Sequence, residues 1–329
     1  MIVIMSEESD LMTNHVINWL SHFQVPFVRI NKSTSINLEK FEIDASKVHF
    51  SLIIHNPDTP PIQIDSTEIK AFWHRRGELH ITYPFIEAVK NVEDKKIAQR
   101  LNFYLGLEGR RIKEVILSQL VRYPSIGNYH NSEVNKIDNL IVAQEVGFDI
   151  PQTLITNQKE WLQEFIEKTP AITKAMFIGA LPLEGISFGA GTHSIYKENI
   201  EALAKNSFPS FVQEQLDKAY ELRIFYLHGN CYASAIFSQN DAQTSVDFRN
   251  YNKQKPNRTP PYKLPKTVED KIQAFMKKTN QNSGSIDLVV TKDKRYVFLE
   301  VNPIGQFAQV SYPCNYYLDK KVAEYLAHA

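Results

Sequence analysis

Two carboxylates and an amide near the end of the chain have the types and spacing of a metal site. Glu300 and Asn302 are two residues apart in an apolar run that Pro303 ends, and Asp287 lies in the apolar run before it. On a β-strand, residues two apart share a face at a separation of roughly 6.6 Å, and an antiparallel hairpin would bring Asp287 to the same face. Such oxygen ligands suit Mg²⁺, which keeps several waters and is usually completed by phosphates. The alternative is a set of ordinary surface charges, but both carboxylates stand inside apolar runs, where a charge needs a partner.

Two cations occur where a nearby anion would stabilise them. Lys136 is expected in the first turn of a helix over residues 132–146, with Ser132 as its N-cap. A lysine there opposes the helix dipole unless an anion lies close by. Arg223 lies between apolar neighbours in the predicted strand 221–227, so its guanidinium is expected to be partly enclosed and to need an anionic partner.

Other cations stand at the ends of strands. Lys174 leads from a predicted strand into residues 175–191, where glycines would let the backbone close over phosphates, and an ordinary surface loop is the alternative. Arg75 and Arg76 end the sequence Trp-His-Arg-Arg at another strand end. For these two arginines, solvent exposure and binding of an anion or peptide are equal alternatives.

Composition bounds the class of protein. The chain has 329 residues, enough for two or three domains, and 43% of them are hydrophobic. Its formal net charge is +0, so we expect neither nucleic acid nor a membrane surface as partner. Cys231 and Cys314 lack the spacing of metal ligands, and so few cysteines predict a reduced, cytoplasmic protein without a disulfide framework. The sequence contains neither an apolar run of membrane-spanning length nor the pattern of a signal peptide.

Alternating strand and helix patterns at the start of the chain predict a small open α/β sheet without a glycine-rich phosphate fingerprint. Its strands are expected at residues 1–5, 26–30, 48–54 and 69–73, with a helix at 9–23. Turn residues at 123–128 predict a boundary after a mostly helical stretch. We therefore expect an N-terminal domain with a helical linker at 1–124, a central domain at 125–207 and a C-terminal domain at 208–329.

Taken in order, these residues resemble the ATP-grasp superfamily of carboxylate–amine ligases over about residues 128–317, and the first domain resembles that superfamily's pre-ATP-grasp domain. The resemblance implies an α/β (α+β) ATP-grasp fold: an N-terminal pre-ATP-grasp α/β domain, a central α/β domain and a C-terminal antiparallel-sheet domain, with ATP in the cleft between the last two. The residues it implies for ATP binding are Lys136, Lys174, Gln213, Glu214, Gln215, Leu216, Asp217, Glu221 and Asn250. It also implies that Arg223 and Arg249 act in catalysis and that Asp287, Glu300 and Asn302 hold one or two Mg²⁺ ions.

Three stretches, at residues 73–76, 151–157 and 302–307, resemble the graspetide synthetases, which are microviridin-type or grasp-with-spasm peptide maturases. This resemblance implies that ATP phosphorylates Asp or Glu side chains of a ribosomal precursor peptide with a leader and a core. Ser or Thr hydroxyls or Lys amines would then attack, giving ω-ester or ω-amide macrocycles. Arg75 and Arg76 are expected to bind core carboxylates, and a homodimer is left open. The alternatives are a small-substrate ATP-grasp carboxylate–amine ligase and a non-enzymatic ATP-binding scaffold.

Overall fold

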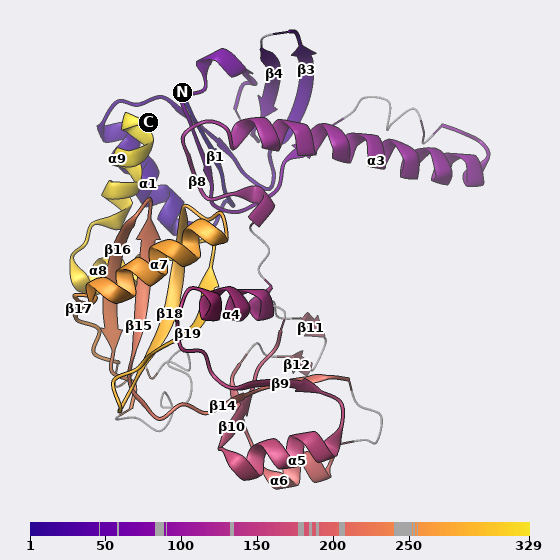
Figure 1. The fold of residues 1–329 in the computed structure, drawn as a ribbon. Coiled ribbons are helices and arrows are strands. Elements are labelled where there is room, and N and C mark those ends of the chain that lie inside the picture. The colour runs from indigo at the N-terminus through magenta and orange to yellow at the C-terminus, as the bar shows by residue number, and fades with distance from the viewer. Residues whose placement is uncertain are drawn as a thin grey trace. The chain divides into compact units, whose positions relative to one another are not determined.

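The structure is a computed structural model that describes residues 1–45, 47–57, 59–82, 89, 91–131, 135–176, 181–183, 186–188, 191–203, 208–239, 252, 254 and 256–329. Three residues singled out in the sequence, Ser132, Arg249 and Asn250, lie outside the described residues. Contacts divide the chain into two units (Figure 1): Met1–His130 with Tyr317–Ala329, and Asn131–Tyr316.

The first unit contains a four-stranded parallel sheet in the order β2-β1-β6-β8. Its strands are β1 (Ile2–Met5), β2 (Phe27–Ile30), β6 (Ala71–His74) and β8 (Ser125–Ile126). Helix α1 (Leu11–His22) begins after Asp10, whose carboxylate accepts a hydrogen bond from Thr13 N, and it lies beside α9 (Leu318–His328). Because parallel strands end at one edge of a sheet, the residues that follow β1 and β6 lie close together.

A second sheet of this unit has the order β5-β4-β3-β7, with β3 (Ser35–Ile43), β4 (Val48–His55), β5 (Ile62–Asp65) and β7 (His80–Ile81). The expectation that residues 48–54 join the first sheet is wrong, because β4 pairs antiparallel along the whole of β3. Apolar residues of both sheets nevertheless share one core. The short helix η1 (Ser66–Glu68) follows β5. The long helix α3 (Lys95–Leu120) packs on the core with its last turns, through Ile112, Ile116, Leu117 and Leu120.

The second unit begins with a smaller sheet in the order β13-β10-β14-β9. Its strands are β9 (Thr153–Thr156), β10 (Ala171–Thr173), β13 (His193–Ile195) and β14 (Ser210–Glu214). Helices α5 (Lys159–Lys168) and α6 (Lys197–Glu201) cover one face through Leu162 and Ile200 (Figure 1). A separate hairpin of β11 (Leu181–Leu183) and β12 (Ile186–Phe188) occupies part of the stretch expected to be a loop.

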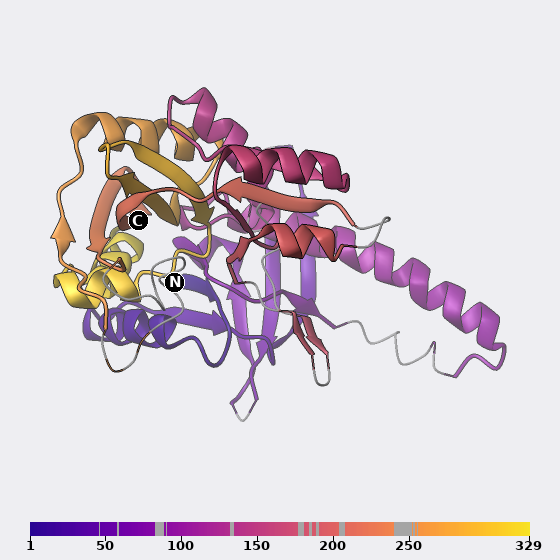
Figure 2. The same cartoon turned by 90° about the horizontal axis from the view of Figure 1, so that it is seen from below.

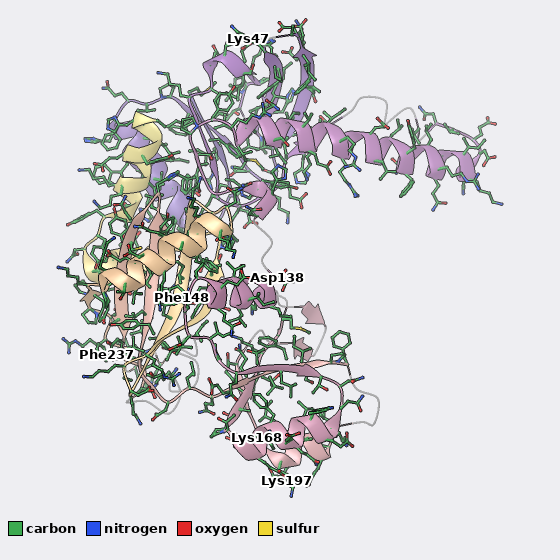
Figure 3. The ribbon with its side chains drawn as sticks, viewed as in Figure 1. Lys47, Asp138, Phe148, Lys168, Lys197 and Phe237 are labelled. Carbon is green, nitrogen blue, oxygen red and sulfur yellow. The ribbon has the colours of Figure 1, made fainter. Side chains whose placement is uncertain are left out.

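The second unit also contains an antiparallel sheet in the order β17-β16-β15-β18-β19. Its strands are β15 (Lys218–Leu227), β16 (Asn230–Ile236), β17 (Pro261–Tyr262), β18 (Ser283–Thr291) and β19 (Tyr296–Asn302). The predicted hairpin that joins the strands of Asp287 and Glu300 is therefore confirmed, and the predicted strand 221–227 lies within β15. Helices α4 (Lys136–Glu145) and α7 (Lys266–Lys278) cover one face of this sheet, and α8 (Ala308–Cys314) follows it (Figure 2). Phe148, labelled in Figure 3, packs its ring on Phe298 of β19 in the shared core.

Helix α4 begins later than the sequence analysis expected. Asn135 is its N-cap, with Oδ1 accepting hydrogen bonds from Ile137 N and Asp138 N, so Lys136 is the first helical residue. Gly147 follows the helix with φ +88°, a left-handed conformation that favours glycine at a helix end. The short helix η2 (Tyr129–Asn131) precedes α4, and the predicted domain boundaries after residues 124 and 207 stay a prediction.

Candidate active site

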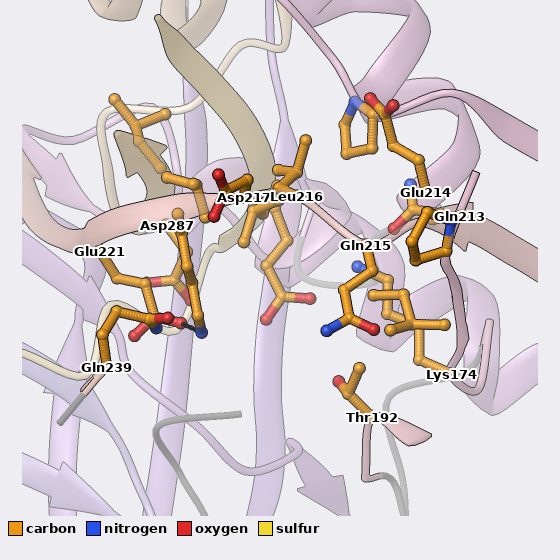
Figure 4. A pocket seen from close by; sticks show the side chains of 18 residues that line it. Lys174, Thr192, Gln213, Glu214, Gln215, Leu216, Asp217, Glu221, Gln239 and Asp287 are labelled. Carbon is orange, nitrogen blue, oxygen red and sulfur yellow. Dashed lines mark hydrogen bonds and ion pairs between the residues drawn. The ribbon is translucent and has the colours of Figure 1, made fainter. Parts of the chain in front are cut away.

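A cavity of about 450 Å³ lies in the second unit, between the small sheet and the antiparallel sheet. Its walls come from both sheets and from the connection between β14 and β15. The lining residues are Pro151, Pro170, Ile172, Lys174, Thr192, Gln213, Glu214, Gln215, Leu216, Asp217, Lys218, Glu221, Gln239, Asp287, Leu288, Val289, Leu299 and Glu300. Figure 4 shows Lys174, Thr192 and Gln215 toward one end of the cavity and Glu221, Gln239 and Asp287 toward the other. Nine residues of the predicted site thus line one cavity.

Three predicted residues form a row across neighbouring strands of the antiparallel sheet. Arg223 on β15 pairs in register with Asp287 on β18, which pairs with Glu300 on β19. Directly opposed side chains on one face of a sheet lie within about 5.5 Å at their Cβ atoms. The Arg223 Nη1 atom donates to Asp287 Oδ2 over 2.5 Å. The row therefore sets one guanidinium beside two adjacent carboxylates.

The period-two pattern of β15 explains why this charged row faces away from the core. Leu222, Ile224 and Tyr226 point into the hydrophobic core, so the alternate residues Glu221 and Arg223 occupy the opposite face. The same alternation on β18 sends its apolar residues into the core and Asp287 to the cavity side. Arg223 is 7% exposed and Asp287 7% exposed, so the enclosed guanidinium predicted from the sequence has an equally enclosed carboxylate partner.

Two predicted lysines approach the same cavity from the small sheet and from α4. The Lys136 Nζ atom lies 3.7 Å from Glu300 Oε2 and donates to the carbonyl oxygen of Ala175 over 3.1 Å. Lys174 follows β10 and lines the cavity, with its Nζ atom 5.8 Å from the centroid of the Phe211 ring. The helix start at Lys136 is therefore fixed beside the carboxylate row, where the dipole argument placed an anion.

The residues that connect β14 to β15 line the cavity, and hydrogen bonds hold parts of their backbone. Gln215 N donates to Pro170 O over 2.7 Å, and Lys218 N donates to Leu216 O over 3.0 Å. Within the described part of the chain, Leu216 N donates no hydrogen bond, so this N–H can meet an acceptor in the cavity. Asp217 is held by Lys292, whose N donates to the carbonyl oxygen of Asp217 over 3.0 Å.

The two side chains that precede this connection form hydrogen bonds that hold the cavity wall together. Gln213 Nε2 donates to Thr153 Oγ1 over 2.9 Å, and Glu214 Oε1 accepts from Gln152 N over 3.1 Å. The first bond ties β14 to its neighbour β9, and the second ties it to the residue just before β9. Any contact that Gln213 and Glu214 make with a ligand is therefore expected to use the backbone rather than these side-chain atoms.

Sequence reasoning missed a buried polar cluster at the start of β15. The Lys218 Nζ and Glu221 Oε1 atoms are 2.5 Å apart, and Ser238 Oγ donates to Glu221 Oε2 over 3.2 Å. Burial raises the pKa of Glu221, while Lys218 and the hydrogen bond from Ser238 act in the opposite direction. Lys218 lies three residues before Glu221, and in a regular strand two side chains at that spacing point to opposite faces. A bulge between Lys218 and Tyr220 in the pairing with β18 changes this alternation, and the sequence carries no signal for it.

One predicted metal ligand, Asn302, is not among the residues that line the cavity. Asn302 pairs in register with Ser285, and its Oδ1 accepts from Ile304 N over 3.0 Å in the turn that ends β19. Arg249 and Asn250 belong to the part of the chain outside the description. The roles predicted for these three residues remain predictions.

The two arginines after β6 belong to the first unit and differ from one another. Arg75 is 2% exposed, and its Nε donates to Asp10 Oδ2 over 3.1 Å. Arg76 has a side chain 30% exposed, with Nε 3.4 Å from the same carboxylate oxygen and Nη1 3.7 Å from Glu7 Oε2. Arg75 is thus an interior residue instead of a solvent-exposed strand end, because Asp10 compensates its charge. Binding of a peptide carboxylate by either arginine stays a prediction.

The oxygen atoms beside the cavity fit a magnesium ion. Asp287 and Glu300 are adjacent across the sheet, and both line the cavity. Among the described residues, no group of three or more His, Cys, Asp or Glu side chains gathers as a ready-made metal cage. Mg²⁺ typically binds one or two carboxylates and takes its other ligands from phosphates and water. Two carboxylates at one wall of an open cavity match that requirement.

Comparison with solved structures identifies the fold. The macrocyclase MdnC of Microcystis aeruginosa MRC, solved with the precursor peptide MdnA, is 24% identical over 100% of this chain and 99% of that chain, with a TM-score of 0.74. A RiPP-associated ATP-grasp ligase of Chryseobacterium gregarium, solved with ADP and a leader and core peptide, is 22% identical over 99% and 95%, with a TM-score of 0.75. The ATP-grasp ligase PsnB, complexed with a minimal precursor, Mg and ADP, is 16% identical over 99% and 96%, with a TM-score of 0.68.

The chain therefore has the ATP-grasp fold along its whole length, as the resemblance implied. No protein-family model matches the chain, and no curated protein matches it in sequence. Within the described residues, no helix combines the length and apolarity that crossing a bilayer would take.

Proposed function

We propose that this chain is an ATP-dependent peptide macrocyclase. It would phosphorylate Asp or Glu side chains of a ribosomal precursor peptide and join them to Ser or Thr hydroxyls or Lys amines, giving ω-ester or ω-amide rings. The observation that carries the proposal is that Asp287 and Glu300, in a row with Arg223, line the same cavity as Lys174 and the connection between β14 and β15. The structures of MdnC, PsnB and the Chryseobacterium ligase, which contain precursor peptides, support the choice of substrate.

The proposed ATP site uses the two ends of the cavity differently. Leu216 N would donate to the adenine ring, since Leu216 lines the cavity and this donor has no other acceptor in the described chain. Lys174 and Lys136 would neutralise phosphates, and Glu221 would accept hydrogen bonds from the ribose. Asp217 and Gln215 complete the wall beside the base, and Asn250 is expected near the terminal phosphate.

Asp287 and Glu300 would hold one or two Mg²⁺ ions, with Asn302 as a further ligand. A bound Mg²⁺ supplies charge neutralisation between the phosphates of ATP and the attacking carboxylate. Cations of the protein would supply the remaining stabilisation of negative charge. Arg223 and Arg249 would stabilise the charge that spreads over the transferring phosphoryl group, and removing one such preorganised contact typically costs about 3 kcal/mol of transition-state stabilisation.

The proposed reaction needs positioning rather than a protein nucleophile. A substrate carboxylate oxygen attacks the γ-phosphorus of ATP, and the bond from this phosphorus to the oxygen that bridges it to the β-phosphorus breaks. ADP leaves, and the peptide side chain becomes an acyl phosphate. A hydroxyl or amine of the same peptide then attacks the acyl carbon, loses its proton and expels inorganic phosphate. Each ring therefore removes the elements of one water molecule from the peptide and converts one ATP to ADP and phosphate. Holding the two side chains together supplies most of the rate.

Two other functions are compatible with parts of the site. A small-substrate carboxylate–amine ligase would use the same ATP and metal residues and differ only in what it accepts. A non-enzymatic ATP-binding scaffold would have no use for two adjacent carboxylates beside two compensating cations. We place the reaction in the cytoplasm, which supplies ATP, and both cysteines are free thiols in the structure. The proposed central and C-terminal domains, 125–207 and 208–329, would then supply the two walls of the ATP cleft.

The proposal is tested by incubating the full chain with ATP, Mg²⁺ and a candidate precursor peptide that carries a leader and a core with Asp or Glu and Ser, Thr or Lys. Mass spectrometry should record successive losses of one water, matched by ADP release. Reactions with EDTA, and with AMPPNP in place of ATP, serve as controls. Ligation of free amino acids instead of ring closure would favour the small-substrate ligase, and nucleotide binding without any turnover would favour the scaffold.

A further inference from the structure

A β-bulge at the start of β15 turns Lys218 toward the cavity. In the pairing of β15 with β18, the register shifts between Lys218 and Tyr220, so one residue of β15 has no opposite partner. Without this extra residue, Lys218 and Glu221 would point to opposite faces of the sheet. In the structure both residues line the cavity, and their side chains form an ion pair. Bulges often redirect a side chain beside an active site, and this one brings a cation to Glu221.

Both carboxylate oxygens of Glu221 are held by donors of the protein. Lys218 Nζ lies 2.5 Å from Oε1, and Ser238 Oγ donates to Oε2 over 3.2 Å. Ser238 can reach this carboxylate because Ile236 pairs in register with Glu221 and Ser238 follows two residues later. Lys218 is 7% exposed and Glu221 6% exposed, so surrounding residues enclose the pair. A carboxylate has about four acceptor positions, so each oxygen keeps room for a further donor.

Lys218 also supports the negative charge of Glu221. Burial raises the pKa of Glu221, Lys218 lowers it, and the nearby charge of Asp287 raises it again. Asp287 lies at the same end of the cavity as Glu221 (Figure 4). Arg223, two residues after Glu221, donates instead to Asp287. An ionised carboxylate only accepts hydrogen bonds, whereas a protonated one carries a donor on one oxygen. The ion pair with Lys218 therefore favours a Glu221 side chain that accepts at both oxygens.

We propose that Lys218 is a positioning residue that aims the Glu221 carboxylate at the 2′- and 3′-hydroxyls of a nucleotide ribose and thereby selects ribonucleotides over deoxyribonucleotides. The inference rests on the proposed function for the presence of a nucleotide in this cavity. Two neighbouring hydroxyls are two donors side by side, which match the remaining acceptor position on each oxygen of Glu221. A nucleotide that lacks one of the hydroxyls would leave one oxygen of a buried carboxylate short of a donor. Sites built to bind a hydroxyl reject analogues that lack it.

Calorimetry with the full chain, Mg²⁺ and no peptide tests the selection. We expect the parent chain to bind ADP more tightly than 2′-deoxy-ADP or 3′-deoxy-ADP by about tenfold or more. Lys218→Met keeps a side chain of similar length without the charge, and we expect each ratio to fall to about threefold or less. The matched control is Lys266→Met, which removes an exposed lysine that pairs with Asp270 over 2.8 Å and should keep the parent ratios.

The measurement distinguishes failure of this inference from failure of the proposed function. ADP binding by the parent chain with no preference over the deoxynucleotides would overturn the inference and leave the nucleotide site in place. Parent ratios in Lys218→Met would overturn the role of Lys218. No binding of ADP at all would overturn the proposed function, and the inference with it.

A second comparison tests whether Lys218 acts through Glu221. Adding Lys218→Met to Glu221→Gln should change the affinity for ADP by less than about twofold, because the carboxylate that Lys218 positions is already gone. A further loss of about tenfold would mean that Lys218 contacts the nucleotide directly, which would overturn the positioning role. Both chains lack the buried carboxylate. The comparison therefore holds even if Lys218→Met alone, which leaves that charge without its partner, fails to fold.

Discussion

Arg223 and Asp287 face one another across β15 and β18, with 2.5 Å between Nη1 and Oδ2. Glu300 follows on the next strand and has Lys136 3.7 Å away. Each carboxylate of the row therefore has a cation of its own within the protein. A bound metal ion would compete with Arg223 and Lys136 for these carboxylates. We infer that both cations could then bind phosphate oxygens. Charge balance within the row thus explains how two neighbouring carboxylates are tolerated in a sheet that is otherwise buried.

Glu300→Gln should abolish ATP consumption while the fold persists. The substitution keeps the shape of the side chain and removes the charge that a metal ion needs. Glu300 lies on the edge strand β19 with its side chain 20% exposed, so the loss of its pair with Lys136 should change the free energy of unfolding by less than about 1 kcal/mol. Coupled ADP-release assays at saturating Mg²⁺ measure the first effect, and thermal unfolding measures the second.

The control for Glu300→Gln is Asp293→Asn in the turn of the same hairpin. Asp293 pairs with Arg295 over 2.7 Å, and its side chain is 62% exposed. This control should retain the parent rate. ATP consumption near the parent level in Glu300→Gln would remove Glu300 from the metal site.

Asp287→Asn should lose both activity and stability. The neutral amide leaves the guanidinium of Arg223 buried without its charge partner, a change that typically costs about 3 kcal/mol. Replacing both partners, as Asp287→Leu with Arg223→Met, should recover stability because no isolated charge remains buried. Chemical denaturation and ADP release together separate the two effects. If the double replacement restored turnover, the row would be structural and our metal assignment would be wrong.

The sequence predicts the chemistry-bearing strands well and the packing around them poorly. Alternation in β15 and β18 places Glu221, Arg223 and Asp287 on one face, and the ordered motifs carry the ATP-grasp fold. Local patterns could not reveal that Arg75 is buried and paired with Asp10, since the two residues are 65 positions apart in the sequence. The cation Lys218 was missed because a bulge sets its orientation. Helix α4 begins at Lys136 with Asn135 as its cap, and the sequence alone could not choose between Asn135 and Ser132 because both are good capping residues.

Arg249→Ala should slow ring closure more than it weakens binding of ATP. Its expected partner is the γ-phosphate, whose charge distribution changes most in the transition state, so the contact is worth more there than in the ground state. Single-turnover rates by quenched flow and nucleotide affinity by calorimetry report the two quantities. We expect the rate to fall by at least tenfold, with a smaller change in affinity.

Arg258→Ala is the matched control for Arg249→Ala. Arg258 is exposed, and its guanidinium lies 5.9 Å from the centroid of the Phe237 ring, so its loss should leave the single-turnover rate unchanged. A steep loss of nucleotide affinity in Arg249→Ala at an unchanged rate would make Arg249 a binding group only.

His74 should make the first unit less stable in mild acid. Burial lowers the pKa of His74 from 6.5 to about 4. Between these two values the unfolded chain binds a proton that the folded chain does not, so stability is present above pH 6.5 and is lost as the pH falls toward about 4. The full effect is about 3 kcal/mol.

The experiment for His74 compares the pH dependence of unfolding in the parent chain and in His74→Gln, which lacks the titrating group. The difference in free energy of unfolding between the two should shrink as the pH falls from 6.5 to about 4. His80→Gln changes an exposed histidine of the same unit and should reproduce the parent curve. A parallel offset of His74→Gln at every pH would mean that the folded and unfolded chains bind protons equally at this residue.

Arg75 and Arg76 need separate tests because one is interior and the other is accessible. Arg75→Ala deprives Asp10 of a partner at 3.1 Å, and Asp10 is itself buried and caps α1, so we expect the free energy of unfolding to fall by about 3 kcal/mol. Impaired cyclisation in that variant would therefore say little about the peptide. Arg76→Gln removes only contacts at 3.4 and 3.7 Å from a side chain that is 30% exposed, and stability should change by less than about 1 kcal/mol.

Arg76→Gln is consequently the variant that tests binding of core carboxylates. We expect slower cyclisation by mass spectrometry, together with unchanged binding of the isolated leader peptide by calorimetry, because the leader would dock elsewhere and act by raising the local concentration of the core. Lys70→Gln, at an exposed position just before β6, is a control that removes a cation without touching Asp10. Weaker leader binding in Arg76→Gln would assign Arg76 to the leader instead of the core. Unchanged cyclisation would leave Arg76 as a strand-end cation that serves only to compensate Glu7 and Asp10.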